Sequence, residues 1–247
     1  MAVGLVQVYD LPVFEVEHVA EDGSTRRGRL SECWGARFEK AAPVRKFVSK
    51  RGTPGFSGFR WSATTGGHVG YESWLERDHL MVLDFDPAIV GIASQPFWLH
   101  WHDGHRRRRH APDYFARRAD GTGIVVDVRA DDRIDSASAE AFEATARACA
   151  QVGWVFRRAG LLEPVFVANL RWLGGYRHPR CMRGDVAELL VEAFAQPVPL
   201  FTGAEAVGDR LKVLPTLFHL MWRQSLIADL RSAPLGSGTL VATAGAR

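Results

Sequence analysis

The sequence contains very little lysine. Lysines and arginines together number 31 in 247 residues, yet the lysines are only Lys40, Lys46, Lys50 and Lys212. No lysine therefore occurs between positions 50 and 212, and any cationic chemistry in that interval depends on arginine or histidine. The net charge of +3 is too small to indicate nucleic-acid binding by itself.

Cysteines are also few, and none are paired in sequence. Cys33, Cys149 and Cys181 lie far apart without a C-x-x-C pair, which excludes a disulfide framework and argues against a zinc ribbon. We expect three reduced and buried thiols.

Long apolar runs are missing as well. No stretch approaches the roughly 18–20 apolar residues of a membrane span, and the first ten residues lack the basic start and apolar stretch of a secretory signal. We expect a cytoplasmic protein without a membrane segment. The composition, 47% hydrophobic and 24% charged, is ordinary for one large or two small globular domains.

Several catalytic signatures are absent. There is no G-x-S-x-G elbow and no G-x-x-x-x-G-K phosphate loop, so ATP would have to be bound by a partner. The histidines show no H-x-x-x-H spacing with a nearby glutamate, which argues against a zinc hydrolase.

The hydrophobic pattern predicts an α/β body followed by a helical module, with the boundary near residue 168. Residues 1–70 suggest short strands and basic loops, and a helix is expected from about 68–71 to Phe85, where Asp86-Pro87 stops it. Further strands are expected at 89–93, 97–102, 124–129, 154–158 and 164–168. Further helices are expected at 136–152, 169–176, 184–194 and 214–229. The resulting domains are 1–168 and 169–247.

Two aspartates stand out by their setting. Asp113 follows a proline at the start of an aromatic strand, just after the arginine run Arg106, Arg107, Arg108 and Arg109. Asp127 interrupts an apolar strand, where alternation places it on one face with Arg129. A carboxylate in a buried strand requires a metal, a cation or hydrogen-bond donors.

Glu76, on the preceding predicted helix, supplies a third carboxylate. Three such hard oxygen ligands suit Mg²⁺ or Mn²⁺, which polarise a phosphodiester and activate water. The arginine run would contact DNA phosphates without reading sequence. Two alternatives stay open, because an Asp-x-Arg pair is also typical of a structural ion pair and an arginine run of a solvated loop.

Five segments of the chain carry a family resemblance. They are Tyr71-Glu72-Ser73-Trp74-Leu75-Glu76-Arg77-Asp78, Leu83-Asp84-Phe85-Asp86-Pro87, Ser94-Gln95-Pro96-Phe97, Pro112-Asp113-Tyr114-Phe115 and Val126-Asp127-Val128-Arg129. Over about residues 60–170 the chain resembles the TnsA-like endonuclease subunits of heteromeric transposases, members of the PD-(D/E)xK superfamily. The resemblance implies a restriction-endonuclease-like mixed central sheet flanked by helices, followed by a winged-helix-like C-terminal domain. It also implies cleavage of the 5′ strands at transposon ends, while a separate transposase subunit cuts and joins the 3′ strands.

The resemblance assigns roles to individual residues. Glu76 matches the helix carboxylate, Asp113 the metal-bridging aspartate and Asp127 the second strand position, whereas Arg129 replaces the pattern's lysine. Glu72 is the rival for the helix position, and Gln95 also matches, either functionally or by satisfying backbone groups between strands. The implied cofactor is Mg²⁺, with Mn²⁺ as a substitute, and the implied partners are double-stranded DNA at transposon ends, a transposase subunit and an ATPase regulator.

Arg129 leaves two readings of the activity. Arginine keeps the positive charge of lysine but stays protonated, so it cannot act as a base. If a metal-bound hydroxide is the nucleophile, the charge alone suffices; otherwise the chain is an inactive, architectural subunit that docks its partners through residues 169–247. An unrelated repair or restriction nuclease of the same fold is a further alternative.

Overall fold

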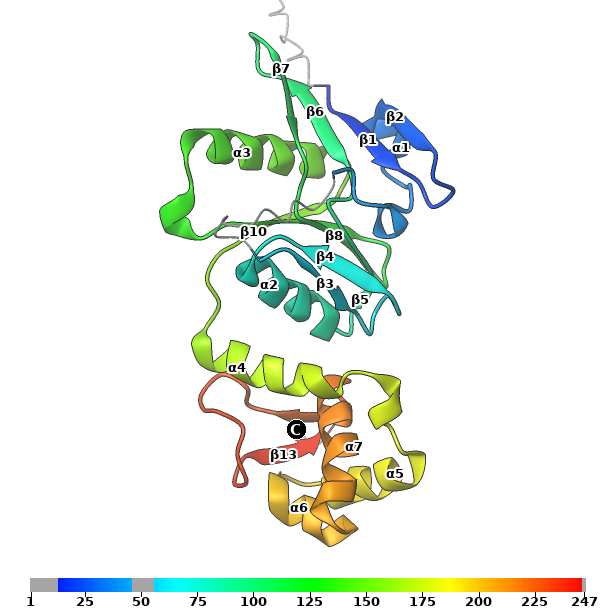
Figure 1. The fold of residues 1–247 in the computed structure, drawn as a ribbon, viewed down its shortest axis with the longest axis vertical. Helices are drawn as coiled ribbons and strands as arrows, with labels where there is room; N and C mark the ends of the chain where they lie inside the picture. Colours follow the sequence, from blue (N-terminus) through cyan, green and yellow to red (C-terminus); the bar gives the residue numbers. More distant parts are fainter. Residues whose placement is uncertain (1–12, 46–55, 246–247) are drawn as a thin grey trace, which may run out of the picture.

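The structure is a computed structural model that describes residues 13–45 and 56–245 (Figure 1). Within them the chain forms a mixed α/β fold whose body is built on two four-stranded sheets, with helices and a small sheet in the C-terminal part. Lys46 and Lys50 lie outside the described residues.

The central sheet has the strand order β10-β9-β8-β5. Its strands are β5 (Ile89–Ser94), β8 (Tyr114–Arg118), β9 (Gly123–Val128) and β10 (Val155–Ala159). Neighbouring strands are antiparallel except β9 and β10, which are parallel and are connected through α3 (Ser136–Gln151).

Helices cover the two faces of this sheet because its central strand is apolar on both sides. Ile124 and Val126 of β9 pack in one core with Leu80 of α2 (Trp74–Phe85), whereas Val125 packs in a second core with Ala148 of α3. All six residues of β9 are buried, as expected for a strand covered on both faces.

A second, antiparallel sheet has the order β2-β1-β6-β7. Its strands are β1 (Glu15–Val19), β2 (Thr25–Arg29), β6 (Trp98–His102) and β7 (Arg107–His110). Its inner face, which includes Val16 and Leu99, joins the core that α3 covers. A hairpin of β3 (Gly58–Trp61) and β4 (His68–Tyr71) and the short helix α1 (Leu30–Cys33) complete the body.

The C-terminal part packs around its own core. It contains α4 (Pro164–Leu173), α5 (Gly184–Ala193), α6 (Leu200–Val207), α7 (Arg210–Trp222) and the sheet β11-β13-β12, formed by Val198–Pro199, Leu240–Thr243 and Leu226–Ala228. Figure 1 shows these elements as the lower part of the molecule. Met81 of α2 is buried in this C-terminal core, so α2 packs against both parts of the chain.

Several expected elements differ from those in the structure. Residues 68–71 form β4 rather than the start of a helix, and α2 begins at Trp74 because Ser73 caps it. Residues 164–168 form the first turns of α4, where Pro164 stands at the N-terminus and tertiary packing buries Phe166 and Leu170. The expected helix 214–229 ends at Trp222, and Gln224 then takes a left-handed conformation with φ of 55°.

The helix before Asp86-Pro87 ends at Phe85, as expected. Gly104 and Gly121 lie in hairpin turns and have the positive φ values that glycine tolerates. The three cysteines are free, but only Cys149 is buried, so the expectation of three buried thiols is wrong for the other two. A boundary at residue 168 would fall inside α4, since the loop that separates β10 from α4 spans residues 160–163.

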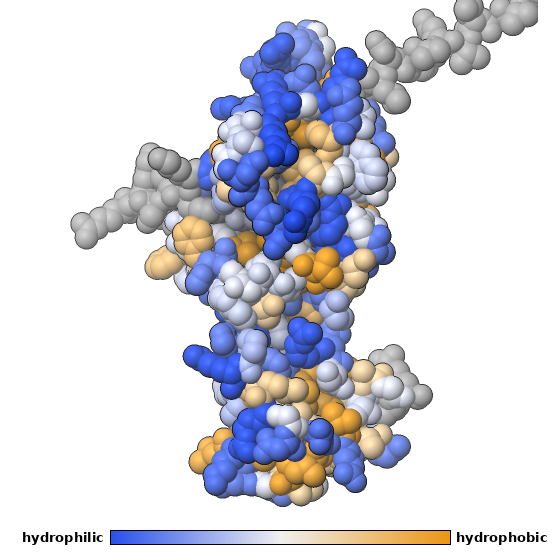
Figure 2. Space-filling view, turned by 90° about the vertical axis from the view of Figure 1, so that its right-hand side faces the viewer, coloured by the Kyte–Doolittle hydropathy of each residue, from blue (hydrophilic) through white to orange (hydrophobic). Residues whose placement is uncertain are grey.

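Among the described residues, no helix combines the length and the apolar character needed to cross a lipid bilayer. Figure 2 shows that strongly hydrophilic residues dominate the upper part of the face in view, whereas apolar residues gather over the lower, C-terminal part.

Candidate functional site

The carboxylates that the sequence singles out lie where α2 meets the central sheet. Asp113 immediately precedes β8, Asp127 lies near the end of β9, and Glu76 is in the first turn of α2. Tyr114, which is fully buried, fixes this arrangement because its hydroxyl is within hydrogen-bond distance of the backbone oxygens of Gly70 (3.2 Å) and Glu76 (3.3 Å). The first turn of α2 is thereby held over the start of β8.

Asp113 is the electrostatic centre of the group. Its Oδ2 accepts a hydrogen bond from the backbone N–H of Val128 at 2.7 Å, which links it to the end of β9. Burial, together with the negative charges of Glu76 and Asp127, raises the pKa of Asp113 well above its usual range, and Arg45 acts in the opposite direction. Glu76 and Asp127 are therefore close enough to Asp113 to disfavour its ionised form.

Asp127 carries a carboxylate oxygen without a partner. The residue is only 2% exposed, and its Oδ1 lies 2.8 Å from Nε2 of His110. Its Oδ2 is shielded from solvent and makes no hydrogen bond with any of residues 13–45 and 56–245. Leaving a buried acceptor unsatisfied costs about 1–3 kcal/mol, and more for a charged group, so this oxygen is suited to a cation.

Glu76 forms capping hydrogen bonds at the N-terminus of α2. Its carboxylate accepts hydrogen bonds from the Ser73 hydroxyl (2.9 Å) and the Glu72 backbone N–H (2.7 Å), while Ser73 Oγ accepts from the Glu76 backbone N–H (3.1 Å). This is a capping box, in which side chains satisfy free backbone donors of the first turn. Burial nevertheless raises the pKa of Glu76.

The rival Glu72 is held by a different partner. It precedes α2 instead of lying one helical turn from Glu76, and its carboxylate forms an ion pair with Arg45 at 2.5 Å. Glu72, the rival for the helix position, therefore lies outside the helix. Among residues 13–45 and 56–245, no group of three or more His, Cys, Asp or Glu side chains converges as a ready metal-ligand set.

The donor chemistry nevertheless fits a hard divalent cation at Asp113 and Asp127. Both offer carboxylate oxygens, one of them without a donor, and their mutual repulsion is what a bound cation relieves. Each carboxylate oxygen of Glu76 accepts one capping hydrogen bond and retains a second lone pair.

Arg129 borders this site from the end of β9. Its backbone N–H donates to Ala159 O at 2.9 Å, and its side chain is exposed. It lines, with Asp113 and Arg45, two clefts of about 200 and 510 Å³, the first of which also includes Asp127 and the second Glu76. Within the described part of the chain, the Arg129 guanidinium forms no ion pair or hydrogen bond, so the structural Asp-x-Arg pair is not seen there.

The four arginines of the basic run differ in their surroundings. Arg107, Arg108 and Arg109 belong to β7 rather than to a loop. Arg108 is tied to Asp103 at 2.6 Å and to Glu140 at 2.9 Å, and Arg106 lies 3.9 Å from Asp103. Arg109 stacks over the ring of Trp98 at 4.4 Å.

Sequence reasoning missed His110 and Arg45 as members of the site. His110 hydrogen-bonds Asp127, and Arg45 lines both clefts. His110 has a weak sequence signal, since it lies just before Pro112-Asp113 at the end of a strand that reaches the site. Gln95 links strands through its backbone, where its N–H donates to Asp113 O at 2.9 Å and its carbonyl accepts from Val44 N–H at 3.0 Å.

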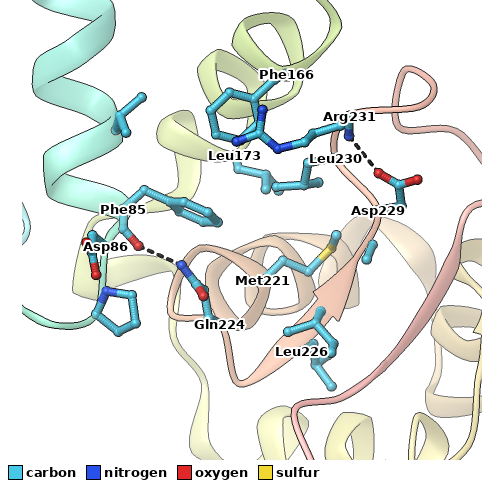
Figure 3. Close-up of a pocket in the computed structure, with 14 residues that line it drawn as sticks. Phe85, Asp86, Phe166, Leu173, Met221, Gln224, Leu226, Asp229, Leu230 and Arg231 are labelled. Atoms are coloured by element: carbon cyan, nitrogen blue, oxygen red, sulfur yellow. Dashed lines mark hydrogen bonds between the residues drawn. The ribbon is translucent and has the colours of Figure 1, made fainter. Parts of the chain in front are cut away.

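A larger cavity of about 590 Å³ lies away from these carboxylates, between α2 and the C-terminal part (Figure 3). Phe85, Phe166, Met221 and Leu226 make it mostly apolar, and Gln224 spans it with a hydrogen bond to the Phe85 carbonyl at 2.8 Å.

A search with protein-family models found no match to this chain, and a comparison with curated protein sequences likewise found none.

Proposed function

We propose that this chain is a metal-dependent DNA endonuclease, specifically a TnsA-like subunit that hydrolyses phosphodiester bonds in the 5′ strands at transposon ends. The observation that carries the proposal is the unsatisfied Oδ2 of Asp127 beside Asp113, whose pKa is raised by burial and by neighbouring carboxylates. These groups lie next to clefts lined by arginines, as an anionic substrate requires.

The fold supports the same proposal. A mixed sheet with α2 and α3 on its opposite faces is the core that a restriction-endonuclease-like enzyme has in the resemblance stated above. Helix α2 and strands β8 and β9 carry Glu76, Asp113 and Asp127 in the expected order, and Asp113 lines one cleft with Asp127 and another with Glu76.

In this mechanism Asp113 and Asp127 would hold Mg²⁺ or Mn²⁺, and Glu76 would supply a further carboxylate oxygen. The bound ion supplies a Lewis acid that activates water and polarises the phosphodiester. His110 fixes the orientation of Asp127 through its 2.8 Å contact. Arg129 binds the phosphate and stabilises its negative charge, but transfers no proton because a guanidinium stays protonated.

The C-terminal part is proposed to be a winged-helix-like module that binds the transposase subunit and the ATPase regulator. The order α5, β11, α6, α7, β12, β13, in which β11 and β12 both pair with β13, supports this assignment.

An architectural, non-catalytic subunit is the second candidate. Two observations favour it: arginine stands where the family pattern has lysine, and the carboxylate of Glu76 is engaged in the helix cap.

Nicking of duplex DNA carrying transposon ends, with the transposase partner and Mg²⁺ or Mn²⁺ present, tests the proposal. Asp127→Asn should abolish cleavage, whereas Asp120→Asn, in an exposed hairpin turn, should not. Metal-independent cleavage, or normal cleavage by Asp127→Asn, would exclude the proposed site.

Arg129 distinguishes the catalytic from the architectural reading. Arg129→Lys should preserve or raise cleavage, because it restores the family's residue. Arg129→Ala should lower cleavage by about 10²–10³-fold, as expected for loss of one preorganised charge donor. Thermal melts of the same samples serve as the control for folding, and full activity of Arg129→Ala would remove this residue from the mechanism.

A further inference from the structure

The sheet β2-β1-β6-β7 has one buried and one outward face, and its register assigns each side chain of β7 to one of them. Arg108 and His110 are opposite Trp101 and Leu99, which are buried, so they belong to the inner face. Arg107 and Arg109 are opposite His102 and His100 and therefore share the outward face.

The arginines on the two faces differ in whether they form ion pairs. On the inner face, Arg108 forms ion pairs with Asp103 and Glu140. On the outward face, Arg107 and Arg109 are exposed and form no ion pair with any carboxylate among the described residues. Arg27, further along this face on β2, is paired with Glu15 at 2.6 Å, whereas Arg107 acts on Glu15 only through a longer-range attraction that lowers the pKa of this carboxyl without forming an ion pair.

The outward face is continuous with the candidate cleavage site. Arg109 stacks on Trp98, and both line the cleft that contains Asp113 and Asp127. Arg129 lines the same cleft, and it borders a further one of about 300 Å³ together with Arg109. Arg107, Arg109 and Arg129 thus form a row of unpaired cations that leads from the sheet to the carboxylates.

We infer that this row, Arg107–Arg109–Arg129, is the track that binds the phosphate backbone of duplex DNA next to the bond to be cut. The inference rests on the proposed function. Stacking on Trp98 fixes the plane of the Arg109 guanidinium while leaving its N–H groups free, so it can form charge-assisted hydrogen bonds with phosphate at little further loss of conformational freedom. Such contacts position the duplex without reading its sequence.

The test is DNA binding by the full chain under conditions that prevent cleavage. We would measure the anisotropy of a labelled duplex in EDTA between about 50 and 200 mM salt. The slope of log K against log salt is negative, and each lost phosphate contact reduces its magnitude by about 0.9. In the double variant Arg107→Gln/Arg109→Gln the magnitude should therefore fall by about 1.8. Arg108→Gln is the matched control: it removes the same charge from the same strand and should leave the slope unchanged, although its melting temperature should fall.

Three outcomes would overturn the track. These are an unchanged slope in the double variant, an equal loss in Arg108→Gln, and a defect confined to anionic lipid vesicles with normal DNA binding. The proposed function fails separately: a chain that binds DNA through Arg107 and Arg109 but never cleaves it with metal and partner present would keep the track and lose the nuclease. If the chain cleaves normally but the double variant shows an unchanged salt slope, the nuclease stands and the track is excluded.

Discussion

Asp113 shows how a single carboxylate can oppose folding in order to prepare a site. Its Oδ2 gains one hydrogen bond from Val128, but burial and the charges of Glu76 and Asp127 disfavour its ionised form. A bound cation would reverse that balance, because its positive charge would offset the carboxylate charges that otherwise repel. Stability and function are therefore in conflict at this residue.

Asp113→Asn should abolish cleavage and maintain or raise the melting temperature of the metal-free chain at neutral pH. Since the pKa of Asp113 is raised in the folded state, its contribution to stability is fully present below the unfolded value and is lost as pH rises through the folded value. The asparagine variant lacks this loss and can still accept from Val128. Thermal melts between about pH 4 and pH 8 should show a flatter profile for the variant. If Asp113→Asn melts at a lower temperature than the unsubstituted chain at neutral pH, charge repulsion at Asp113 does not destabilise the fold.

At the same scale, the sequence predicts some members of the site and not others. Asp113 and Asp127 were predictable because a carboxylate within or beside an apolar strand is costly to bury unless a cation or hydrogen-bond donors compensate its charge. His110 was not, because it reaches Asp127 only through the meeting of β7 and β9, which belong to different sheets. Arg45 lies far away in sequence, and its place between the clefts follows from the tertiary fold.

At the scale of elements, one carboxylate in the first turn of α2 has both a structural role and a proposed functional role. Glu76 closes the capping box that starts the helix, and it is the residue proposed to join the metal site. The Ser-x-x-Glu pattern at 73–76 marks the start of this helix, and residues 68–71 are left free to pair with β3 as strand β4. Local pattern alone did not distinguish that short strand from a helical turn, since pairing with β3 decides it.

Two variants separate the cap from the proposed metal ligand. Ser73→Ala removes the capping oxygen and should cost about 1 kcal/mol of unfolding free energy while retaining cleavage. Glu76→Gln keeps one carbonyl oxygen that can accept from the Glu72 N–H, and its amide NH2 can donate to Ser73 Oγ, but the variant removes the charge, so it should retain stability and lose cleavage. Chemical denaturation paired with nicking assays measures both effects. Normal cleavage by Glu76→Gln would leave this residue as a cap only.

At the scale of the whole molecule, α2 joins the two parts of the chain. One side of the helix covers the central sheet through Leu80 and Leu83, and Met81 enters the C-terminal core. Asp78 of the same helix pairs with Arg171 of α4 at 2.5 Å. The C-terminal part is therefore docked on the helix that carries Glu76, so a partner bound there would have a direct mechanical connection to the proposed site.

Limited proteolysis should reveal this docking. The first cut by chymotrypsin or thermolysin is expected in the 160–163 loop, where Leu161 is 79% exposed, because residues 168–171 are hydrogen-bonded within α4. The two fragments should still elute together in size-exclusion chromatography, held by the buried Met81 and the Asp78–Arg171 pair. Met81→Ala, which should cost about 2–5 kcal/mol, should release them, whereas Val90→Ala at an exposed position should not. A first cut within α4, or fragments that separate without any substitution, would show that the module is only loosely attached.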